Sequence, residues 1–520
     1  MPTPRQHGGA ALAHIPMSVP GFMGLNTQQA GSLLGPEWAT ALSNAVIDES
    51  SRVAARKGYT AITTSAISSQ PIVQLYELVE SDGGTELIAF TDSDVYSSTN
   101  GGTSWASIEG SLAIDDGDWT AVNFNDTIFA ARDGEAPAIY TGTGTFTAVA
   151  DANCPKGGVV LSAFGRVWLS NVDGHQVHYS ALLDATDWTS SDSGVIDLWN
   201  VWPDNDEIMG LAAHNGALVI FGRRTIVFYT DGQGSALGVD PTQMYVVDII
   251  KGTGCIAKYS IQHVDGDIWF LSEHGLQSLG RLQTERSNPL NNLSKNVQDE
   301  LSQRVDTLSD INDLRSVFSA RNRVYLLALP SGSGTETGVS FVFDTRGRLE
   351  DGSARCMGMW TLVPRAVVSS VDNSILMQVV GADGEIGSYS NQTDDGDSYI
   401  FTYESGWMDL TQQGFLLFPK RYEGIFYSDA AVTVQFKWAF DFENEFNVLS
   451  KTFVGSGGGM EWNVGEWGED EWSGGVLLRR GKTTPGLNGE YIKLGINSTI
   501  DGSTFAVQQL DLFAKIGRYA

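Results

Sequence analysis

A short apolar strand recurs along most of this chain, and this recurrence constrains the fold more than any other feature. The seven copies are Leu87–Phe90, Thr127–Ala130, Arg166–Leu169, Ala217–Phe221, Asp267–Leu271, Arg323–Leu327 and Ile375–Val379. Like positions, from Ile88 to Leu376, are separated by steps of 40, 39, 52, 49, 56 and 52 residues. Repeats of about 40 to 50 residues are typical of β-propellers, in which each repeat forms one four-stranded blade. The sequence therefore predicts a β-propeller of roughly six to eight blades.

The composition agrees with many short antiparallel strands. The chain has 59 glycines, 23 phenylalanines, 16 tyrosines and 14 tryptophans, and only 18% of its residues are charged. Glycine follows Asp in turns such as Thr230–Gly234 and Gly381–Ile386, where it supplies the positive φ of a tight hairpin. The expected fold class is mainly β.

Outside the repeats the sequence predicts two further parts. Residues 1–59 are expected to form an extended, proline-rich arm followed by a helix from Pro36 to Lys57, with Gly58 just past its end. Residues 60–397 form the expected propeller, with a helical insertion near 294–314. After about residue 398 the strands alternate in polarity, which is typical of a β-sandwich over residues 398–520.

The charge balance disfavours a protein that grips nucleic acid. The formal net charge is −30, from 62 acidic and 32 basic residues, whereas proteins that neutralise phosphates need a basic surface. Two interpretations of the acidity stay open. It either keeps the protein soluble, or it prevents adhesion to DNA or to an anionic envelope.

Several other classes of protein are disfavoured. Cys154, Cys255 and Cys356 lie about a hundred residues apart, which gives neither a disulfide framework nor a metal-ligand spacing. Such sparse cysteines suit folding in a reducing cytoplasm. The N-terminal residues lack the apolar stretch of a signal peptide, and no apolar run approaches the length of a membrane span.

One hairpin has a recognisable sequence. Ser98–Trp105, with the sequence STNGGTSW, resembles the Asp-box turn of sialidase-type propellers, with Asn100 in place of the aspartate. The expected role is structural: the Asn100 side chain closes the turn and Trp105 buries its ring. A sialidase also needs an arginine cluster, and the candidates are scattered: Arg132, Arg223, Arg224 and Arg365.

Metal-binding and catalytic motifs are weak or missing. His175 and His178 have a possible metal spacing but are expected to lie on a plain turn. The turns Asp115–Asp118 and Asp394–Asp397 could hold Ca²⁺, although neither continues into an EF-hand loop, and solvated turns are expected. No HExxH, P-loop, GxSxG or strand-associated GxGxxG motif is present. We therefore expect no catalytic, cofactor-binding or metal-binding residue and no enzyme activity.

A segment rich in tryptophan and acidic residues interrupts the C-terminal region. In Glu461–Trp472 three tryptophans are spaced five apart among carboxylates. Two interpretations stay open: the rings pack locally, or they contact a partner or another subunit.

The opening Gly24–Thr27 leads to Glu37–Asp48 and the basic, glycine-containing turn Ala54–Tyr59. These segments together resemble the opening of the tail hub, or nozzle, proteins of short-tailed bacteriophages. Later segments are also similar to this group, and they are Trp188–Thr189, Trp199–Pro203, Val219–Ile226, Gly254–Ala257, Asp267–Gly275, the tryptophan-rich segment Glu461–Trp472 and Phe505–Phe513. The resemblance thus touches most of the chain through short motifs.

This resemblance implies a structural β-propeller protein in a six-fold ring at the distal end of the tail. The expected partners are the other copies of the ring and the adjacent tail adaptor, fibre or spike proteins. Six copies would together carry −180, six times the −30 of one chain, so DNA would pass through the ring without specific binding. The protein would be made in the host cytoplasm and reside in the virion tail.

Two other functions stay open at this point. A carbohydrate-active or carbohydrate-binding propeller would explain the Asp-box-like turn and the many tryptophans. A bacterial surface adhesin is a third possibility, which the missing export signal disfavours.

Overall fold

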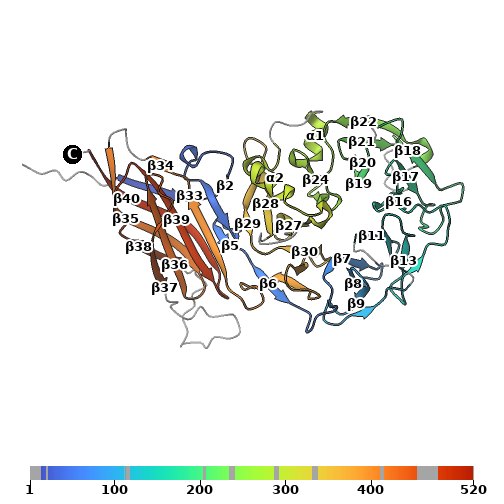
Figure 1. The fold of residues 1–520 in the computed structure, drawn as a ribbon, viewed down its shortest axis with the longest axis horizontal. Helices are drawn as coiled ribbons and strands as arrows, with labels where there is room; N and C mark the ends of the chain where they lie inside the picture. The colour runs from blue at the N-terminus through green and yellow to red at the C-terminus, as the bar shows by residue number, and fades with distance from the viewer. Residues whose placement is uncertain are drawn as a thin grey trace, which may run out of the picture.

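The computed structural model describes residues 13–18, 21–110, 112, 118–202, 206–232, 240–285, 292–330, 338–409, 415–453 and 478–518. Two parts lie side by side along the long axis of the molecule, a ring of small sheets and a pair of longer sheets (Figure 1). The ring is a β-propeller, and the pair of sheets is a β-sandwich.

Seven sheets form the propeller in the described part of the chain. Blades 1 to 4 each have four antiparallel strands. Their strands are β7 (Ile72–Val79), β8 (Thr85–Thr91), β9 (Val95–Ser98) and β10 (Ala106–Ser107); β11 (Thr120–Phe124), β12 (Thr127–Ala131), β13 (Ala138–Tyr140) and β14 (Thr147–Ala148); β15 (Val160–Ala163), β16 (Arg166–Ser170), β17 (Gln176–Tyr179) and β18 (Gly194–Asp197); and β19 (Ile208–His214), β20 (Ala217–Gly222), β21 (Thr225–Thr230) and β22 (Tyr245–Lys251).

Blades 5 to 7 depart from this pattern. Blade 5 has three described strands, β23 (Gln262–Val264), β24 (Asp267–Ser272) and β25 (Gly275–Ser278), and helix α1 (Leu279–Glu285) packs on β24. Blade 6 consists of β26 (Arg315–Ser319), β27 (Val324–Leu329), β28 (Val339–Arg348) and β29 (Ala354–Trp360). Blade 7 contains β30 (Pro364–Ser369), β31 (Ile375–Val379) and β32 (Gly387–Ser390), and its fourth strand comes from elsewhere.

The seven recurring segments of the sequence are the second strands of the seven blades: β8, β12, β16, β20, β24, β27 and β31. All six residues of β27, for example, are buried. A second strand has hydrogen-bonded partners on both edges and neighbouring blades over both faces, which explains its continuous apolar run. The predicted propeller is confirmed, with a count of seven blades in the described residues.

The ring is closed by a strand from the beginning of the chain. β6 (Gly58–Ala61) pairs antiparallel with β32 in the register Tyr59↔Tyr389 and completes blade 7. The first strands of blades 7 and 1, β30 and β7, then lie against each other. Residues far apart in sequence therefore hold the ring shut.

The prediction of a helix from Pro36 to Lys57 is wrong. This segment forms β3 (Trp38–Ser43), β4 (Ala45–Ile47) and β5 (Val53–Ala55). Asn44, between β3 and β4, has a φ of 53°, which interrupts any helix there. The strands pair with distant partners, β3 with β33 (Tyr399–Ser405) and β5 with β40 (Phe505–Arg518), so tertiary pairing overrides the local apolar spacing.

The sandwich combines both ends of the described chain. One sheet has the order β38–β35–β40–β5–β4, and β1 (Ala13–Ser18) also pairs with β40. The facing sheet contains β2 (Gly24–Leu25), β3, β33, β39, β36 and β37, with β34 paired to β39. The remaining bounds are β34 (Met408–Asp409), β35 (Phe415–Ser428), β36 (Val432–Phe440), β37 (Asn447–Phe453), β38 (Leu478–Thr483) and β39 (Tyr491–Ile500). The segment expected to be a separate arm is thus part of the sandwich.

Aromatic rings fill the space between the two sheets. Phe426 of β35 packs against Phe436 of β36 at a centroid distance of 5.8 Å and against Phe505 at 5.7 Å. The Tyr422 hydroxyl donates a hydrogen bond across the core to the Gly495 carbonyl at 3.2 Å. The buried hydroxyl therefore has a partner, and the two sheets share one core.

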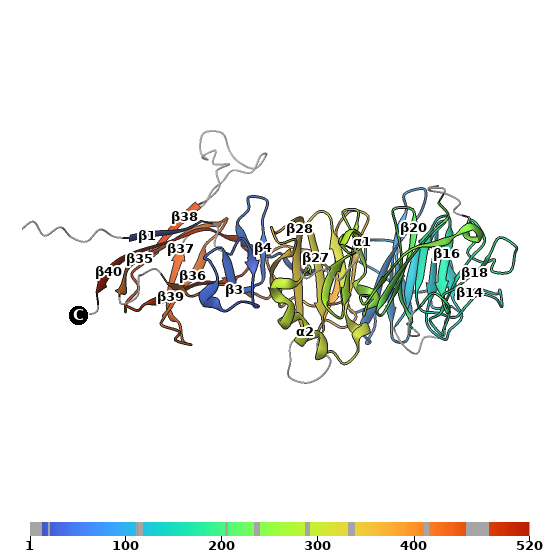
Figure 2. The ribbon, with the colours of Figure 1, turned by 90° about the horizontal axis from the view of Figure 1, so that it is seen from above.

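The sandwich and the propeller share a sheet. β29, the last strand of blade 6, pairs in parallel with β3 through Met359↔Ser43, so one eleven-stranded sheet runs from blade 6 into the sandwich. Figure 2, a view from above, shows the sandwich, blade 6 and the far blades one after another along the molecule. The shared sheet and a common apolar core fix the two parts against each other.

Helical segments occupy the region where an insertion is expected near 294–314. They are a 3₁₀ turn Lys295–Val297, helix α2 (Gln298–Asp306) and a 3₁₀ turn Ile311–Asp313. Leu301 of α2 is buried in the core shared with the sandwich.

A partly buried carboxylate on the sandwich gives a pH-dependent prediction. Burial alone would raise the pKa of Glu404, but hydrogen bonds from Lys437 and Lys493 outweigh burial and lower this pKa. The Nζ–O distances are 2.5 and 2.9 Å. Because the pKa of Glu404 in the folded state lies below its ordinary value of 4.5, the charged carboxylate stabilises the folded protein above pH 4.5. This stabilisation is lost as the pH falls through the folded-state pKa.

We therefore expect Glu404→Gln to lower the free energy of unfolding by about 1–3 kcal/mol at neutral pH. The difference from the unsubstituted chain should shrink as the pH falls below 4.5, the ordinary value for this group. Urea unfolding at a series of pH values measures it. A difference that stays constant across this range contradicts the expected role of the carboxylate.

Candidate functional site

Side chains from opposite blades meet at the axis of the propeller. The first strands β7, β11, β15, β19, β23, β26 and β30 surround this axis. Lys258, just before blade 5, forms an ion pair with Asp118, just before blade 2, at 2.8 Å. Blades 2 and 5 are three apart in a ring of seven, so this contact crosses the axis.

Tyr259 reinforces the crossing. Its hydroxyl donates to Asp118 Oδ1 at 2.6 Å and lies 3.2 Å from the Trp119 carbonyl oxygen. The guanidinium of Arg315, from blade 6, stacks over the Tyr259 ring at 4.3 Å, and its Nη2 donates to the Val73 carbonyl in blade 1 at 2.9 Å. Four blades are thereby tied together by a partly buried polar cluster, which we call the axial brace (Asp118, Lys258, Tyr259 and Arg315).

The chemistry of the axial brace is that of a structural tie. Burial, with the adjacent Asp118 charge, raises the pKa of Tyr259 well above its ordinary value. Burial also raises the pKa of Asp133, which lies nearby and accepts a hydrogen bond from the Gly158 amide. A phenol with a raised pKa is a hydrogen-bond donor and a poor nucleophile at neutral pH. The cluster is therefore suited to holding blades together.

Removal of the Tyr259 hydroxyl tests the axial brace. Tyr259→Phe should lower the free energy of unfolding by about 1.5–3 kcal/mol because the lost hydrogen bond goes to a carboxylate. Tyr245, whose side chain is exposed, offers a control, and Tyr245→Phe should change stability by less than about 0.5 kcal/mol. Urea unfolding followed by tryptophan fluorescence measures both variants. Equal effects of the two substitutions would remove the energetic role of the brace.

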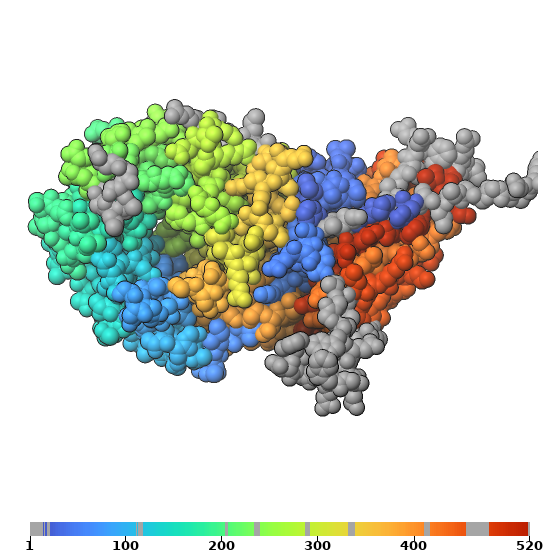
Figure 3. All heavy atoms as spheres, turned by 180° about the vertical axis from the view of Figure 1, so that it is seen from behind, coloured from blue at the N-terminus to red at the C-terminus, as the bar shows by residue number. Residues whose placement is uncertain are grey.

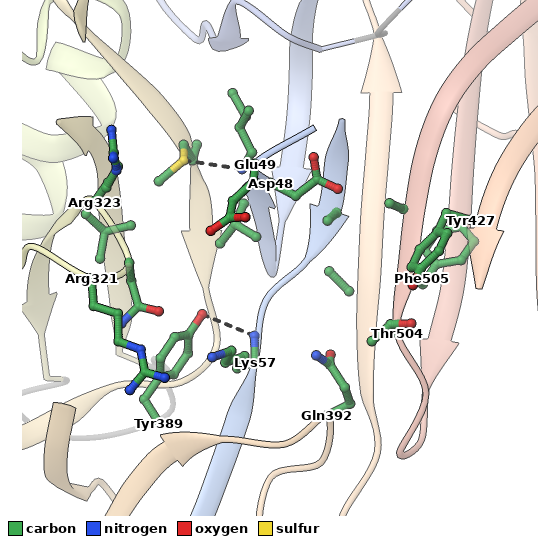
Figure 4. Close-up of a pocket in the computed structure, with 18 of the residues that line it drawn as sticks. Asp48, Glu49, Lys57, Arg321, Arg323, Tyr389, Gln392, Tyr427, Thr504 and Phe505 are labelled. Carbon is green, nitrogen blue, oxygen red and sulfur yellow. Dashed lines mark hydrogen bonds between the residues drawn. The ribbon is translucent and has the colours of Figure 1, made fainter. Parts of the chain in front are cut away.

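A second candidate site is a cavity of about 840 Å³ where the propeller meets the sandwich. Figure 4 shows its two sides: Arg321, Arg323 and Tyr389 come from the propeller, and Tyr427 and Phe505 come from the sandwich. Ligand-binding cavities are typically about 300–1,000 Å³. We call this feature the junction cavity.

The propeller face visible in Figure 3 is also hollowed at its centre.

The junction cavity is unusually basic for so acidic a chain. Lys57, Arg321 and Arg323 line it, and no ion pair in the described part of the chain involves their side chains. Among the lining carboxylates, Asp48 is paired with Arg52 at 2.7 Å, which leaves Glu49. Arg346, also in the wall, is held by Asp344 at 2.8 Å. Three cationic groups therefore face one carboxylate.

Arg56 forms a second brace, between the sandwich and blade 7. Its side chain is 0% exposed and forms two hydrogen bonds with Asp394, at 2.8 and 2.7 Å. Nε donates to the Asn44 amide oxygen at 2.9 Å, and the guanidinium lies 4.1 Å from the centre of the Tyr399 ring. Arg56 sits between β5 and β6, where the chain leaves the sandwich and enters the propeller.

The Asp-box-like turn has the expected geometry. The Ser104 amide donates to Asn100 Oδ1 at 3.0 Å, and the Asn100 side-chain amide donates to Ser104 Oγ at 2.7 Å. Gly102 has a φ of 92°, and Trp105 Nε1 donates to the Gly102 carbonyl at 2.9 Å. The turn joins β9 to β10, the last two strands of blade 1, and its polar groups are used internally.

The scattered arginines remain apart in the fold. Arg132 follows β12 in blade 2, Arg365 lies in β30 of blade 7, and the other two lie in the β20–β21 turn of blade 4. Arg223 and Arg224 both approach Glu273, at 3.9 and 3.2 Å. The structure thus brings together only the pair that is adjacent in sequence.

The possible metal ligands also have other roles. His175 packs edge-on against Trp199 at 4.7 Å, and burial lowers the pKa of His178 in β17. Asp394 binds Arg56, and Asp395 Oδ1 accepts the Ala61 amide hydrogen at 3.2 Å.

No group of three His, Cys, Asp or Glu side chains suited to a metal ion occurs among the described residues. Of the turn 115–118 only Asp118 is described, and the segment 461–472 lies outside the described residues. All three cysteines are buried. Within the described ranges, no helix is long and apolar enough to cross a membrane.

Comparison with known proteins yields similarity of fold alone. No family model and no curated protein matches the chain. Among solved structures, a chain of a mitotic checkpoint complex is 8% identical, with a TM-score of 0.40, and the match covers 64% of this chain and 94% of that one. The C-terminal WD40 domain of Sif2 is 12% identical, with a TM-score of 0.37 and coverage of 73% and 97%. YCF48 bound to a D1 peptide is 10% identical, with a TM-score of 0.36 and coverage of 64% and 95%. These scores carry no argument about function.

Proposed function

We propose that the chain is a structural subunit of a ring, the tail hub or nozzle of a short-tailed bacteriophage. The resemblance of segments throughout the chain to that group motivates the assignment. The structural observation that supports it most is the bracing: side chains cross the propeller axis at Asp118–Lys258, and Arg56 ties the propeller to the sandwich. Such a subunit suits a rigid wall.

The axial brace also bears on the path of DNA. The ion pair and the Tyr259 hydrogen bond occupy the axis of each propeller, so that axis is no passage for a duplex. In the proposed assembly DNA passes through the centre of the ring of subunits. The net charge of −30 per chain would repel phosphates along that channel and prevent specific binding.

The test is to place the protein in a particle. Electron microscopy of phage particles that carry a tagged copy should locate the tag at the distal end of the tail, in a six-fold ring. The purified chain should also fail to shift a DNA duplex at low salt. A protein that stays strictly monomeric with its neighbouring tail proteins, or that is absent from particles, would refute the proposal.

The carbohydrate-directed alternative receives less support. The Asp-box-like turn and the many tryptophans motivate this alternative, but the polar groups of the turn are used within the hairpin itself. Robust cleavage of a glycan, abolished by a single carboxylate substitution, would favour the alternative over the structural role.

A further inference from the structure

The junction cavity combines positive charge with apolar surface. Arg321 and Arg323 flank Asn322 in the turn between β26 and β27, and Lys57 lies on the linker between β5 and β6 (Figure 4). All three basic residues are exposed. Hydrogen bonds from Ser370 and Ser374 lower the pKa of Asp372, in the β30–β31 turn, and the charge of Arg321 contributes to this lowering. The cations are therefore only partly compensated.

The walls of the cavity can receive a ring as well as a carboxylate. Apolar and aromatic side chains from both the propeller and the sandwich also line the cavity, and they are Ile47, Val324, Met357, Tyr389, Tyr427 and Phe505. Tyr389 holds the Lys57 amide through its hydroxyl at 3.1 Å, which fixes that wall. A ligand that carries both carboxylates and aromatic rings fits such a cavity best.

We propose that the junction cavity binds the acidic, tryptophan-bearing segment 461–472 of a second copy of the chain. The segment carries four glutamates, one aspartate and three tryptophans in twelve residues. Its carboxylates complement Lys57, Arg321 and Arg323, and an indole ring complements the apolar wall. Charge-assisted hydrogen bonds and ring burial are the interactions that dominate protein interfaces.

This contact would be of the kind that closes a ring. Segment 461–472 and the cavity are different parts of the chain, so each copy would contribute its segment to one neighbour and its cavity to the other. A head-to-tail contact of this kind generates a closed ring when the rotation between copies closes. The inference rests on the proposed ring function and names the surfaces that join adjacent subunits.

Peptide binding tests the cavity directly. The probe is a fluorescent synthetic peptide of residues 460–473. The receptor is the full chain with Glu466→Gln, Glu469→Gln and Glu471→Gln, so that its own segment competes weakly. We expect saturable binding that weakens with added salt. The additional changes Arg321→Ser and Arg323→Asn should weaken binding at least tenfold. Asn is chosen because Arg323 has a φ of 54°, which Asn tolerates.

The blade 4 turn provides a matched control. Arg223→Ser and Arg224→Asn remove the same two charges from another propeller hairpin, and peptide affinity should stay within twofold. Loss of affinity in both variants would mean that only net charge matters. No binding to the receptor, or equal binding to the Arg321/Arg323 variant, would overturn the proposed cavity contact. Circular dichroism checks that each variant is folded.

A mixing experiment tests whether the partner is a second copy. A chain with the altered cavity and a chain with the altered segment should each sediment as a monomer. Their mixture should form a heterodimer, because one intact cavity then meets one intact segment. A mixture that stays monomeric while the peptide still binds would mean that the segment of one chain does not enter the cavity of another, which overturns the assignment to a second copy.

These outcomes separate the inference from the proposed function. Peptide binding and heterodimer formation use purified chains and need no particle. If both succeed while tagged particles lack the protein, the ring contact stands and the tail assignment fails. If the particles show a six-fold ring and the peptide does not bind, the ring uses other surfaces.

Discussion

Replacing Arg56 by methionine should lower the free energy of unfolding by about 3–5 kcal/mol, because it leaves a carboxylate in the joint without its partner. Arg56 is 0% exposed and binds Asp394 through two nitrogen atoms. It also donates hydrogen bonds to Asn44 and to the Lys57 carbonyl and covers the Tyr399 ring, so the substitution removes several contacts at the joint between sandwich and propeller. Among single changes at polar residues we expect this one to have the largest effect.

The measurement is urea unfolding followed by fluorescence, with the first transition compared because two structural parts are present. Arg304→Met is the matched control. Arg304 pairs with Glu300 one helical turn away and is 37% exposed, so its loss should cost about 0.5 kcal/mol or less. Asp394→Leu combined with Arg56→Met should recover part of the stability, since no unpaired charge then remains. If the free energy of unfolding of the Arg56 variant lies within about 1 kcal/mol of that of the unsubstituted chain, Arg56 does not brace the joint.

Substitution of Gly58 by valine should open the propeller at blade 7. Gly58 begins β6, and a Cβ atom there would lie 1.8 Å from the Thr393 carbonyl oxygen and 2.4 Å from its carbon. Both are backbone atoms, so no rotamer change relieves the clash. We expect a loss of about 3 kcal/mol or more, together with new proteolytic cleavage near β6.

Gly347→Val is the control for this prediction. Gly347 lies in β28, and a Cβ atom there would meet nothing within 4 Å. The control should change stability by less than about 1 kcal/mol and leave the proteolysis pattern unchanged. Equal cleavage patterns for the two valine variants would show that β6 does not hold the ring closed.

The propeller could be predicted because its strongest signal is local. Each second strand is buried on both faces, so it reads as an apolar run such as that of β20 or β27. The outer strands are short and half-exposed, as the exposed two-residue β10 illustrates, and they leave little trace in the sequence. The repeat therefore indicated one strand per blade, and the other strands had to be inferred from the fold.

The error at residues 36–57 has the opposite cause. Trp38, Leu42, Ala45, Val46 and Val53 have a spacing that a helix shares with broken short strands. What decides between them is pairing with β33 and β40, more than 300 residues away in sequence. Local patterns carry no information about such partners.

The candidate sites depend on equally distant contacts. The turn Asp394–Asp397 drew attention as a possible Ca²⁺ site, whereas Asp394 is the partner of Arg56, 338 residues away. Lys258 and Asp118 are 140 residues apart, and nothing in either neighbourhood predicts that they meet. The only part of these sites that the sequence indicated was the basic turn around Arg56 and Lys57, which belongs to the resemblance to phage tail hub proteins.

The pairing of the first strands of the chain with the last ones has a consequence for protein synthesis. β1 and β5 pair with β40, and β6 pairs with β32, so β1, β6 and one edge of β5 have no partner until most of the chain has been translated, whereas the other edge of β5 pairs with β4. At about 5–20 residues per second this delay is on the order of a minute. During that time the early strands present unpaired edges that can join other nascent chains. We therefore expect overproduction to give aggregates that decrease when translation is slowed by cooling or when a chaperone is supplied.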